Sequence, residues 1–151
     1  MKLRHFDTCV TLEQPACILF DFLADPHNLE RVTPTFLRFE FAGAPPANIE
    51  KGATIDYRLR IYGVAVRWIT LVEVYEPPSR FTYIQLKGPY AFWRHTMRCE
   101  SITDGGTAVR DIVDYAMPYG PIGAIAHALL IGRGLRQVFG FRAAELHGIF
   151  G

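Results

Sequence analysis

The chain has 151 residues, of which half are hydrophobic and 13% are aromatic, and its formal net charge is +1. This length suits one domain with a substantial core, so residues 1–151 are treated as a single domain, and the composition excludes intrinsic disorder. Lys and Arg are spread along the chain, without the basic patch that nucleic acid or an anionic membrane requires, so we expect neither as a partner.

The chain carries no signal for a membrane or for an oxidising compartment. Asp7 and Glu13 interrupt the apolar residues after the basic start, so we expect no signal peptide. The most apolar run, residues 122–131, is too short to span a bilayer. The three cysteines form no CxxC motif, and an odd number indicates no disulfide framework. We therefore expect a reduced, cytoplasmic protein.

The N-terminal residues predict a strand followed by a short helix. Residues 3–12 alternate as a strand, one side of which comprises Leu3, His5, Asp7, Cys9 and Thr11. Pro15 then opens a short helix over residues 16–24, because proline is tolerated in the first helical turn.

Two prolines shape the next segment. Proline biases the residue before it away from helix, so we expect breaks at Pro26 and at Pro34 and a helical turn over residues 27–31 between them. Residues 36–42 alternate as a second strand. Two short helices therefore separate the first two strands.

The middle of the chain contains strands in quick succession. They are predicted over residues 53–61, 64–75, 80–87, 90–102 and 107–117. The connections between them are short and contain glycine or proline. Strands connected in this way form an antiparallel meander.

After Pro118 the apolar residues recur at helical spacing. The stripe comprises Ile125, Leu129, Leu135, Phe139, Leu146 and Phe150. A helix over residues 121–147 would be about 40 Å long, enough to cross the whole sheet. Gly132, Gly134 and Gly140 inside it indicate close packing on the sheet, a mild kink, or room for a ligand.

This order of elements predicts an α+β fold with a strand, two short helices, six further strands and a long helix. A twisted antiparallel sheet of seven strands curls into a half-barrel, and one helix can close its mouth without filling it. Large side chains or a ligand must occupy the space between helix and sheet.

The element order and several local strings resemble the START/polyketide-cyclase (SRPBCC) superfamily, whose members have the helix-grip fold. The strings are FDFLADPHNLERVTP (20–34), KGATIDYRLRIYGVAVRW (51–68), VYEPPSRF (74–81), GPYAFWRHTMRCE (88–100) and GGTAVRDIVDYAMPYGPIG (105–123). The resemblance spans essentially the whole chain, and the fourth string resembles a bacterial cyclase/dehydrase-like subgroup. It implies a curved seven-stranded sheet around a long C-terminal helix, with a cavity for a hydrophobic or amphipathic small molecule.

The resemblance implies no particular reaction. Members of the superfamily include lipid carriers, receptors, cyclases and chaperone-binding domains, and a shared fold does not settle function. No catalytic residue can be transferred to this chain from the resemblance.

Turn lengths give an estimate of the strand register. If Tyr62-Gly63 is a two-residue turn, Tyr57 faces Trp68. A two-residue turn at Gly88-Pro89 and a four-residue loop over 103–106 predict the pairs Tyr83–Arg94, Gln85–Phe92, Arg98–Asp111, Arg94–Tyr115 and His95–Asp114. The face that is richer in aromatic residues is then the concave one, and it comprises Tyr57, Leu59, Ile61, Val66, Trp68, Thr70, Val72, Phe81, Tyr83, Gln85, Phe92, Arg94, Val113 and Tyr115.

A bulge of one residue in the strand over 90–102 would exchange its two faces. Trp93, His95 and Met97 would then point inward, and Arg94 would point outward. One of Arg94 and His95 is therefore expected to face the cavity, and the other to face solvent.

Polar residues near the cavity suggest three kinds of chemistry, each with a simpler structural explanation. Arg94 could bind a carboxylate or phosphate, and His95 could exchange a proton, or either could be a surface charge. Arg98 and Asp111 form either a structural cross-strand pair or a pair that positions a ligand. His95 and Asp114 could make an acid–base dyad if both face the cavity.

These patterns predict a ligand-binding site and no assigned catalytic residue. The candidates are Tyr57, Trp68, Tyr83, Phe92, Arg94, His95, Asp111 and Tyr115, of which the aromatic ones are most simply core. The sequence contains no serine-nucleophile motif, no metal-ligand spacing and no phosphate-binding glycine loop, so we expect no metal and no cofactor.

The favoured function is a carrier or sensor of a small hydrophobic or amphipathic ligand: a lipid, an isoprenoid or a polyketide-like molecule. One alternative is a cyclase or dehydratase that uses general acid–base groups in the same cavity. Another is a protein-interaction module that uses the loop over 43–52 and the segment over 118–123. A monomer or a homodimer is compatible with the near-neutral charge.

Overall fold

The structure, a computed structural model, describes residues 2–47, 49–61, 63–127 and 131–150. Its strands are β1 Arg4–Leu12, β2 Glu40–Phe41, β3 Thr54–Ile61, β4 Val64–Glu76, β5 Arg80–Lys87, β6 Phe92–Ser101 and β7 Thr107–Ala116. Its α-helices are α1 Ala16–Ala24, α2 Gly120–Ala126 and α3 Gly132–Phe150, and 3₁₀ turns lie at Pro26–Asn28, Thr35–Leu37 and Thr103–Gly105.

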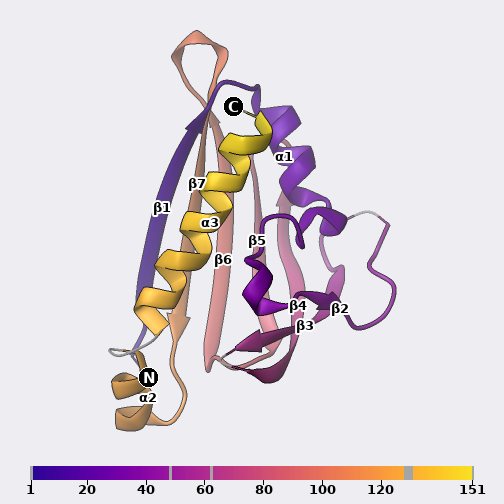
Figure 1. Ribbon diagram of the computed structural model, residues 1–151. Coiled ribbons are helices and arrows are strands. Elements are labelled where there is room, and N and C mark those ends of the chain that lie inside the picture. Colours follow the sequence, from indigo (N-terminus) through magenta and orange to yellow (C-terminus); the bar gives the residue numbers. More distant parts are fainter. Residues whose placement is uncertain (1, 48, 62, 128–130, 151) are drawn as a thin grey trace.

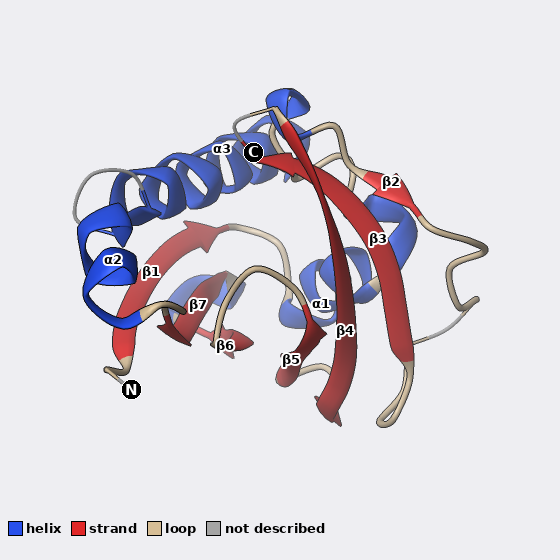
Figure 2. Ribbon diagram, turned by 90° about the horizontal axis from the view of Figure 1, so that it is seen from below, coloured by secondary structure: helices blue, strands red, loops and turns tan. Residues whose placement is uncertain are grey.

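The strands form one antiparallel sheet in the order β1-β7-β6-β5-β4-β3-β2. A meander runs from β2 to β7, and β1 extends it by pairing with β7. Figure 2 shows the sheet bent around a hollow side that α3 crosses. The structure thus confirms the α+β, helix-grip expectation: a curved seven-stranded sheet, a long C-terminal helix, and short helical segments between β1 and β2.

α1 packs against the concave side of the sheet at one end. Its apolar residues gather on the side that faces the sheet. The buried residues are Leu19, Phe20, Leu23 and Ala24. The side-chain amide of Gln14, just before α1, donates a hydrogen bond to the carbonyl of Phe150, and the Thr107 hydroxyl donates one to the carbonyl of Gln14. The C-terminal end of α3 is therefore held beside the start of α1 (Figure 1).

The predicted strand over residues 36–42 is wrong for most of its length. Only Glu40–Phe41 pair as β2, whereas Thr35–Leu37 form a 3₁₀ turn. Phe36 and Leu37 line a cavity instead of pairing with β3. The alternation of apolar residues here therefore does not correspond to strand pairing.

The C-terminal helix is shorter than the sequence predicts. In place of one helix over 121–147, the structure has α2 and the 19-residue α3, which is about 28 Å long. Figure 1 shows α2 below the lower end of α3, near the N-terminus. Within α3 the predicted stripe is confirmed, with Leu135, Phe139 and Leu146 buried. On α2, Ile125 is exposed, and Leu129 lies outside the described residues.

The register between β3 and β4 is as predicted, with Tyr57 opposite Trp68. The register between β5 and β6 is displaced by one residue, so that Tyr83 faces His95 and not Arg94. The cause is the β5–β6 connection, which is longer than a two-residue turn. The Gln85 side chain bonds the backbone of Tyr90 within it, at 2.8 and 3.2 Å, instead of standing opposite Phe92.

The register between β6 and β7 is displaced as well. The last pair is Ser101 with Thr107, so the loop spans residues 102–106 rather than 103–106. His95 therefore faces Val113 and not Asp114. The inward-pointing residues of β6 are Trp93, His95 and Met97, which is the alternative that a shift of one residue predicts.

The core consists of two clusters. The larger joins α1, the sheet and the C-terminal end of α3, and includes Phe20, Phe81, Met97, Val109 and Leu146. The smaller comprises Val113, Tyr115, Leu135 and Phe139. Residues of both clusters border the cavity described next.

Candidate functional site

A cavity of about 480 Å³ lies between α3 and the concave face of the sheet. This volume is in the range of cavities that hold drug-sized molecules. Its lining comes from α1, the segment between α1 and β2, strands β3 to β6 and α3, and is mainly apolar and aromatic. The polar residues of the lining are Thr33, Arg60, Thr70, His95, Gln137 and Arg142, together with Tyr57, Tyr83 and Tyr90.

An aromatic wall forms one side of the cavity. Trp68 stacks on Tyr57 with ring centroids 6.1 Å apart and meets Trp93 edge-on at 5.2 Å. Trp93 in turn contacts Tyr90 at 4.7 Å. Both tryptophans of the chain thus line the cavity. Flat rings of this kind offer a large apolar contact surface to an occupant.

Three buried ionisable groups meet between β6, β7 and α3. The His95 Nε2 atom lies 2.8 Å from the Asp111 Oδ1 atom, and the Arg142 Nη2 atom lies 3.2 Å from the same oxygen. His95, Asp111 and Arg142 are 8%, 4% and 9% exposed. One carboxylate therefore serves two partners and ties α3 to the sheet.

The surroundings of these groups determine their protonation. Burial alone would raise the pKa of Asp111, but the Arg142 guanidinium and the His95 hydrogen bond outweigh it and hold this pKa below its usual value. Asp111 is therefore a carboxylate at neutral pH. Burial raises the pKa of Tyr57 to about 12 and also raises that of Tyr83, so both phenols stay protonated.

Four buried polar atoms of cavity-lining residues have no hydrogen-bond partner among the described residues. They are Trp68 Nε1, Tyr83 Oη, and Nε and Nη2 of Arg142. Buried polar atoms in proteins are normally paired. Their concentration around one cavity is the arrangement expected where a bound molecule supplies the missing partners.

Gly134 keeps the helix side of the cavity open. It lines the cavity, and a Cβ atom added to it would meet no atom within 4 Å. A Cβ atom on Gly140 would also meet nothing, whereas one on Gly132 would contact the ring of His127 at 3.5 Å. Close packing on the sheet therefore does not explain Gly134 or Gly140.

Four of the eight predicted site residues line the cavity: Tyr57, Trp68, Tyr83 and His95. Asp111 lies directly behind His95. Tyr115 is buried in the smaller core cluster, where its Oη atom lies 2.6 Å from His127 Nε2. The role of these residues as ligand contacts stays a prediction.

The remaining two predicted residues, Phe92 and Arg94, do not line the cavity. Arg94 lies on the outer face of the sheet, where its Nη2 atom is 2.6 Å from Glu73 Oε1 and its side chain is 46% exposed. Phe92 pairs with Ala116 at the start of β6. The prediction that Phe92 and Arg94 face the cavity is wrong, because the one-residue displacement of β6 exchanges its faces.

The predicted pairs Arg98–Asp111 and His95–Asp114 are wrong for the same reason. Asp111 points to the concave side and pairs with His95. Arg98 stands opposite Arg110 on the outer side of β6. The cavity therefore has an imidazole–carboxylate pair at its wall, but its carboxylate is Asp111.

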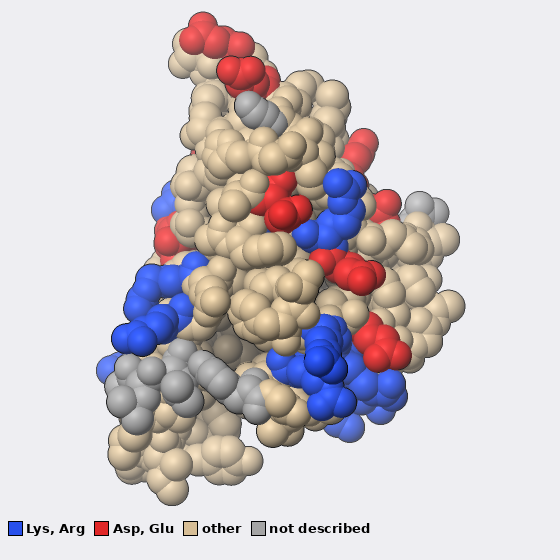
Figure 3. All heavy atoms as spheres, viewed as in Figure 1, with Lys and Arg blue, Asp and Glu red and all other residues tan. Residues whose placement is uncertain are grey.

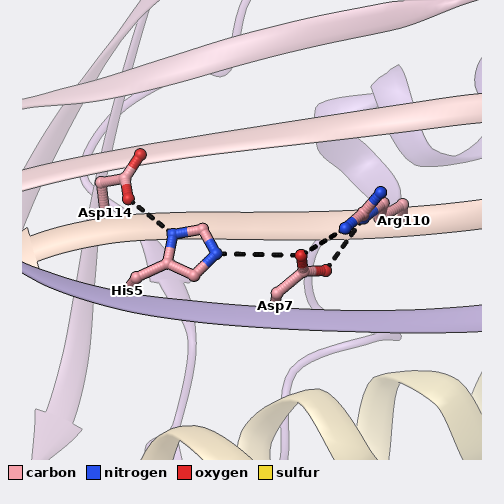
Figure 4. Close-up of polar contacts among 4 residues, drawn as sticks. All are labelled: His5, Asp7, Arg110 and Asp114. Atoms are coloured by element: carbon pink, nitrogen blue, oxygen red, sulfur yellow. Dashed lines mark hydrogen bonds and ion pairs between the residues drawn. The ribbon is translucent and has the colours of Figure 1, made fainter.

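Asp114 belongs to a row of charged residues on the outer face of β1 and β7, which Figure 4 shows. His5 Nδ1 lies 2.8 Å from Asp114, and His5 Nε2 lies 3.8 Å from Asp7. Arg110 donates two hydrogen bonds to Asp7. Exposed ion pairs contribute little to stability, so this row is a structural feature of the surface.

Sequence analysis missed Arg142. It lies three residues after Phe139 and four before Leu146, on the buried stripe of α3. A charged residue at an apolar position of an amphipathic helix is the signal that could have identified it, because a buried arginine is rare unless it is paired.

Among the described residues, no three His, Cys, Asp or Glu side chains come together as a metal site would need. None of the helices in the described ranges combines the length and the apolar character needed to cross a bilayer.

No family model and no curated protein matches the chain. Solved structures do match it. The ZhuI aromatase/cyclase of Streptomyces sp. R1128 matches with a TM-score of 0.67 at 15% identity, over 98% of this chain and 96% of that one. A START superfamily protein of Mycobacterium smegmatis gives 0.67 at 12%, over 97% and 96%. Protein Mll3558 of Rhizobium loti gives 0.68 at 23%, over 97% and 100%.

At these identities the likeness shows the fold and not the activity. The matches cover nearly the full length of each chain, and they include an aromatase/cyclase and a START superfamily protein, the two kinds of protein that the sequence strings resemble. The chain therefore has the START/polyketide-cyclase fold.

Proposed function

We propose that the chain binds a small hydrophobic or amphipathic molecule, such as a lipid, an isoprenoid or a polyketide-like compound, and acts as its carrier or sensor. The observation that carries the proposal is the cavity of about 480 Å³ with its aromatic wall and its open side at Gly134. An empty apolar cavity costs stability, and an occupant would offset that cost. Fold neighbours that are a START superfamily protein and an aromatase/cyclase support the proposal by analogy.

Native mass spectrometry of the protein purified from its own host tests this proposal. A small organic mass that accompanies the folded chain and disappears on denaturation is the expected result. Trp68 and Trp93 are the two tryptophans of the chain, so their fluorescence should change when an added ligand enters. The proposal fails if nothing accompanies the chain and if lipids, isoprenoids and aromatic polyketide-like compounds all leave the fluorescence unchanged.

A second function, a cyclase or dehydratase reaction, is favoured by the His95–Asp111 pair. The Asp111 carboxylate orients the imidazole, and His95 lines the cavity. Such an imidazole can take a proton from an acidic C–H group or give one to a leaving hydroxyl.

Substitutions separate the two functions. For an enzyme, His95→Ala should reduce turnover by about 10²–10⁴-fold, with the ligand still bound. Arg94→Ala is the matched control, because Arg94 precedes His95 but lies on the outer face. Turnover that survives His95→Ala unchanged would leave the carrier or sensor role alone.

A further inference from the structure

The charged groups of the cavity lining have one sign. Among the described residues that line it are two arginines, Arg60 and Arg142, and one histidine, His95, but no aspartate or glutamate. Asp111 stands behind His95, outside the lining. Arg60 is exposed at the rim, whereas Arg142 is 9% exposed. The lining is therefore suited to an occupant that carries negative charge.

Arg142 is incompletely paired. A guanidinium has five N–H donors, and the ion pair of Arg142 is a single contact to one oxygen of Asp111, which His95 shares. The Nε and Nη2 atoms form one edge of the guanidinium. Nε has no partner among the described residues, and Nη2, which makes the 3.2 Å ion pair with Asp111, has no hydrogen bond there. Such an edge can bind both oxygens of a carboxylate. A cluster that served only to hold α3 on the sheet would be expected to satisfy these donors.

Two further donors stand in the same lining. The Tyr83 hydroxyl and the Trp68 indole N–H are both unpaired among the described residues, and both residues are more than nine-tenths buried. Neighbouring side chains cover these atoms, so contact with a ligand requires side-chain adjustment at the cavity wall, which is common on binding. The groups without a hydrogen bond are thus a guanidinium edge, an indole N–H that can only donate, and a hydroxyl that can donate or accept.

Part of the surface near the cavity is positively charged. Figure 3 shows Lys and Arg side chains grouped beside the lower end of α3 and beside β3. Arg133 and Arg136 on α3 are exposed, as is Arg60 of the lining on β3. Positive charge at the rim of a cavity raises the local concentration of anions.

We propose that the ligand is an acidic amphiphile, whose carboxylate binds Arg142 with hydrogen bonds from Tyr83 and Trp68, and whose apolar body lies along the aromatic wall. The inference rests on the proposed function, because it concerns the same cavity. It adds the charge of the ligand and names Arg142 as the residue that binds that charge.

A pair of probes of equal size tests the charge. Decanoate and decanamide have the same number of heavy atoms and differ in the charge of the head group. Tryptophan fluorescence titration at neutral pH should give a dissociation constant for decanoate about tenfold or more below that for decanamide. Equal affinity for the two compounds overturns the inference while the proposed function stands. Binding of neither compound overturns the inference, and the proposed function falls with it only if the wider panel named above also fails to bind.

Two variants test whether Arg142 is the residue that binds the charged head group. Arg142→Met removes the charge but keeps a long unbranched side chain, and it should abolish the preference for decanoate while leaving the affinity for decanamide nearly unchanged. Arg94→Met is the matched control, because Arg94 lies on the outer face of the sheet, away from the cavity, and this variant should keep the wild-type preference. An Arg142→Met chain that folds and still prefers decanoate overturns the assignment.

Tyr83→Phe keeps the test decisive if Arg142→Met does not fold. It removes only a hydroxyl that is unpaired among the described residues, so the variant should fold. Its affinity for decanoate should fall several-fold, since a hydrogen bond to a charged group is lost. An affinity for decanoate that does not change in Tyr83→Phe overturns the proposed head-group site.

Discussion

Asp111 and Asp114 have the same kind of partner and very different roles. Both lie on β7, and each carboxylate is 2.8 Å from a histidine. Asp111 is 4% exposed and also faces Arg142, whereas the side chain of Asp114 is 38% exposed. Burial, and not the contact itself, decides how much each carboxylate contributes to the free energy of unfolding, because water screens the exposed pair.

Replacing each of these carboxylates measures that difference. Asp111→Asn should lower the free energy of unfolding by about 3–5 kcal/mol, because it leaves Arg142 as a buried charge without a counter-charge. Asp114→Asn, on the same strand, should change it by no more than about 0.5 kcal/mol. Urea denaturation followed by circular dichroism measures both. Equal losses for the two variants would contradict the assigned burial of the Asp111 pair.

The same residue predicts a dependence of stability on pH. The pKa of Asp111 is lowered by folding, so its charge adds stability at pH values above about 3.9, the pKa of an unfolded aspartate. This contribution is lost as the pH falls through the lower pKa of the folded state. The urea midpoint of the wild type should therefore fall more steeply below about pH 4 than that of Asp111→Asn. Parallel curves for the two proteins would show that Asp111 has no lowered pKa.

At the level of secondary-structure elements, the type and the bounds of the strands were predicted from the sequence better than their register. Strands β3 to β7 lie within two residues of their predicted bounds, because alternation and turn residues are local signals. The register of β6 depends instead on loop conformation, which the Gln85 side chain fixes by bonding Tyr90. Since strands have a period of two, one residue of error exchanges Arg94 and His95.

The candidate site was predictable in part for the same reason. Tyr57, Trp68 and Tyr83 come from strands whose alternation identifies the inner face, and all three line the cavity. Arg142 comes from α3, and no local pattern states which residue of a distant helix meets which strand. Its contact with Asp111 follows from the way the helix crosses the sheet.

Gly134 and Gly140 of α3 both have room for a Cβ atom, so replacing each with alanine gives a pair of variants to compare. Gly134→Ala and Gly140→Ala should each raise the free energy of unfolding by up to about 1 kcal/mol, because alanine favours helix and neither added methyl group meets another atom. Only Gly134 lines the cavity, so only Gly134→Ala should weaken the binding of decanoate. Thermal unfolding and tryptophan fluorescence titration measure the two effects. Equal binding by both variants would place the ligand away from α3.

For the whole molecule, stability should depend on whether the cavity is filled. α3 lies over the sheet with a cavity of about 480 Å³ beneath it, so a ligand that binds only the folded chain adds to the free energy of unfolding. At one hundred times its dissociation constant, a ligand adds about 2.7 kcal/mol, which for a chain of this length raises the melting temperature by roughly 5–10 °C.

Protein purified from its own host should therefore melt at a higher temperature than the same protein unfolded, extracted with organic solvent and refolded. Returning the extract to the refolded protein should restore the original melting temperature, whereas an extract from the solvent treatment of buffer alone should not. Scanning calorimetry measures all three samples. Identical melting temperatures would mean that the chain is purified without a stabilising occupant, since a molecule that fills the cavity cannot leave the folded state without a loss of stability.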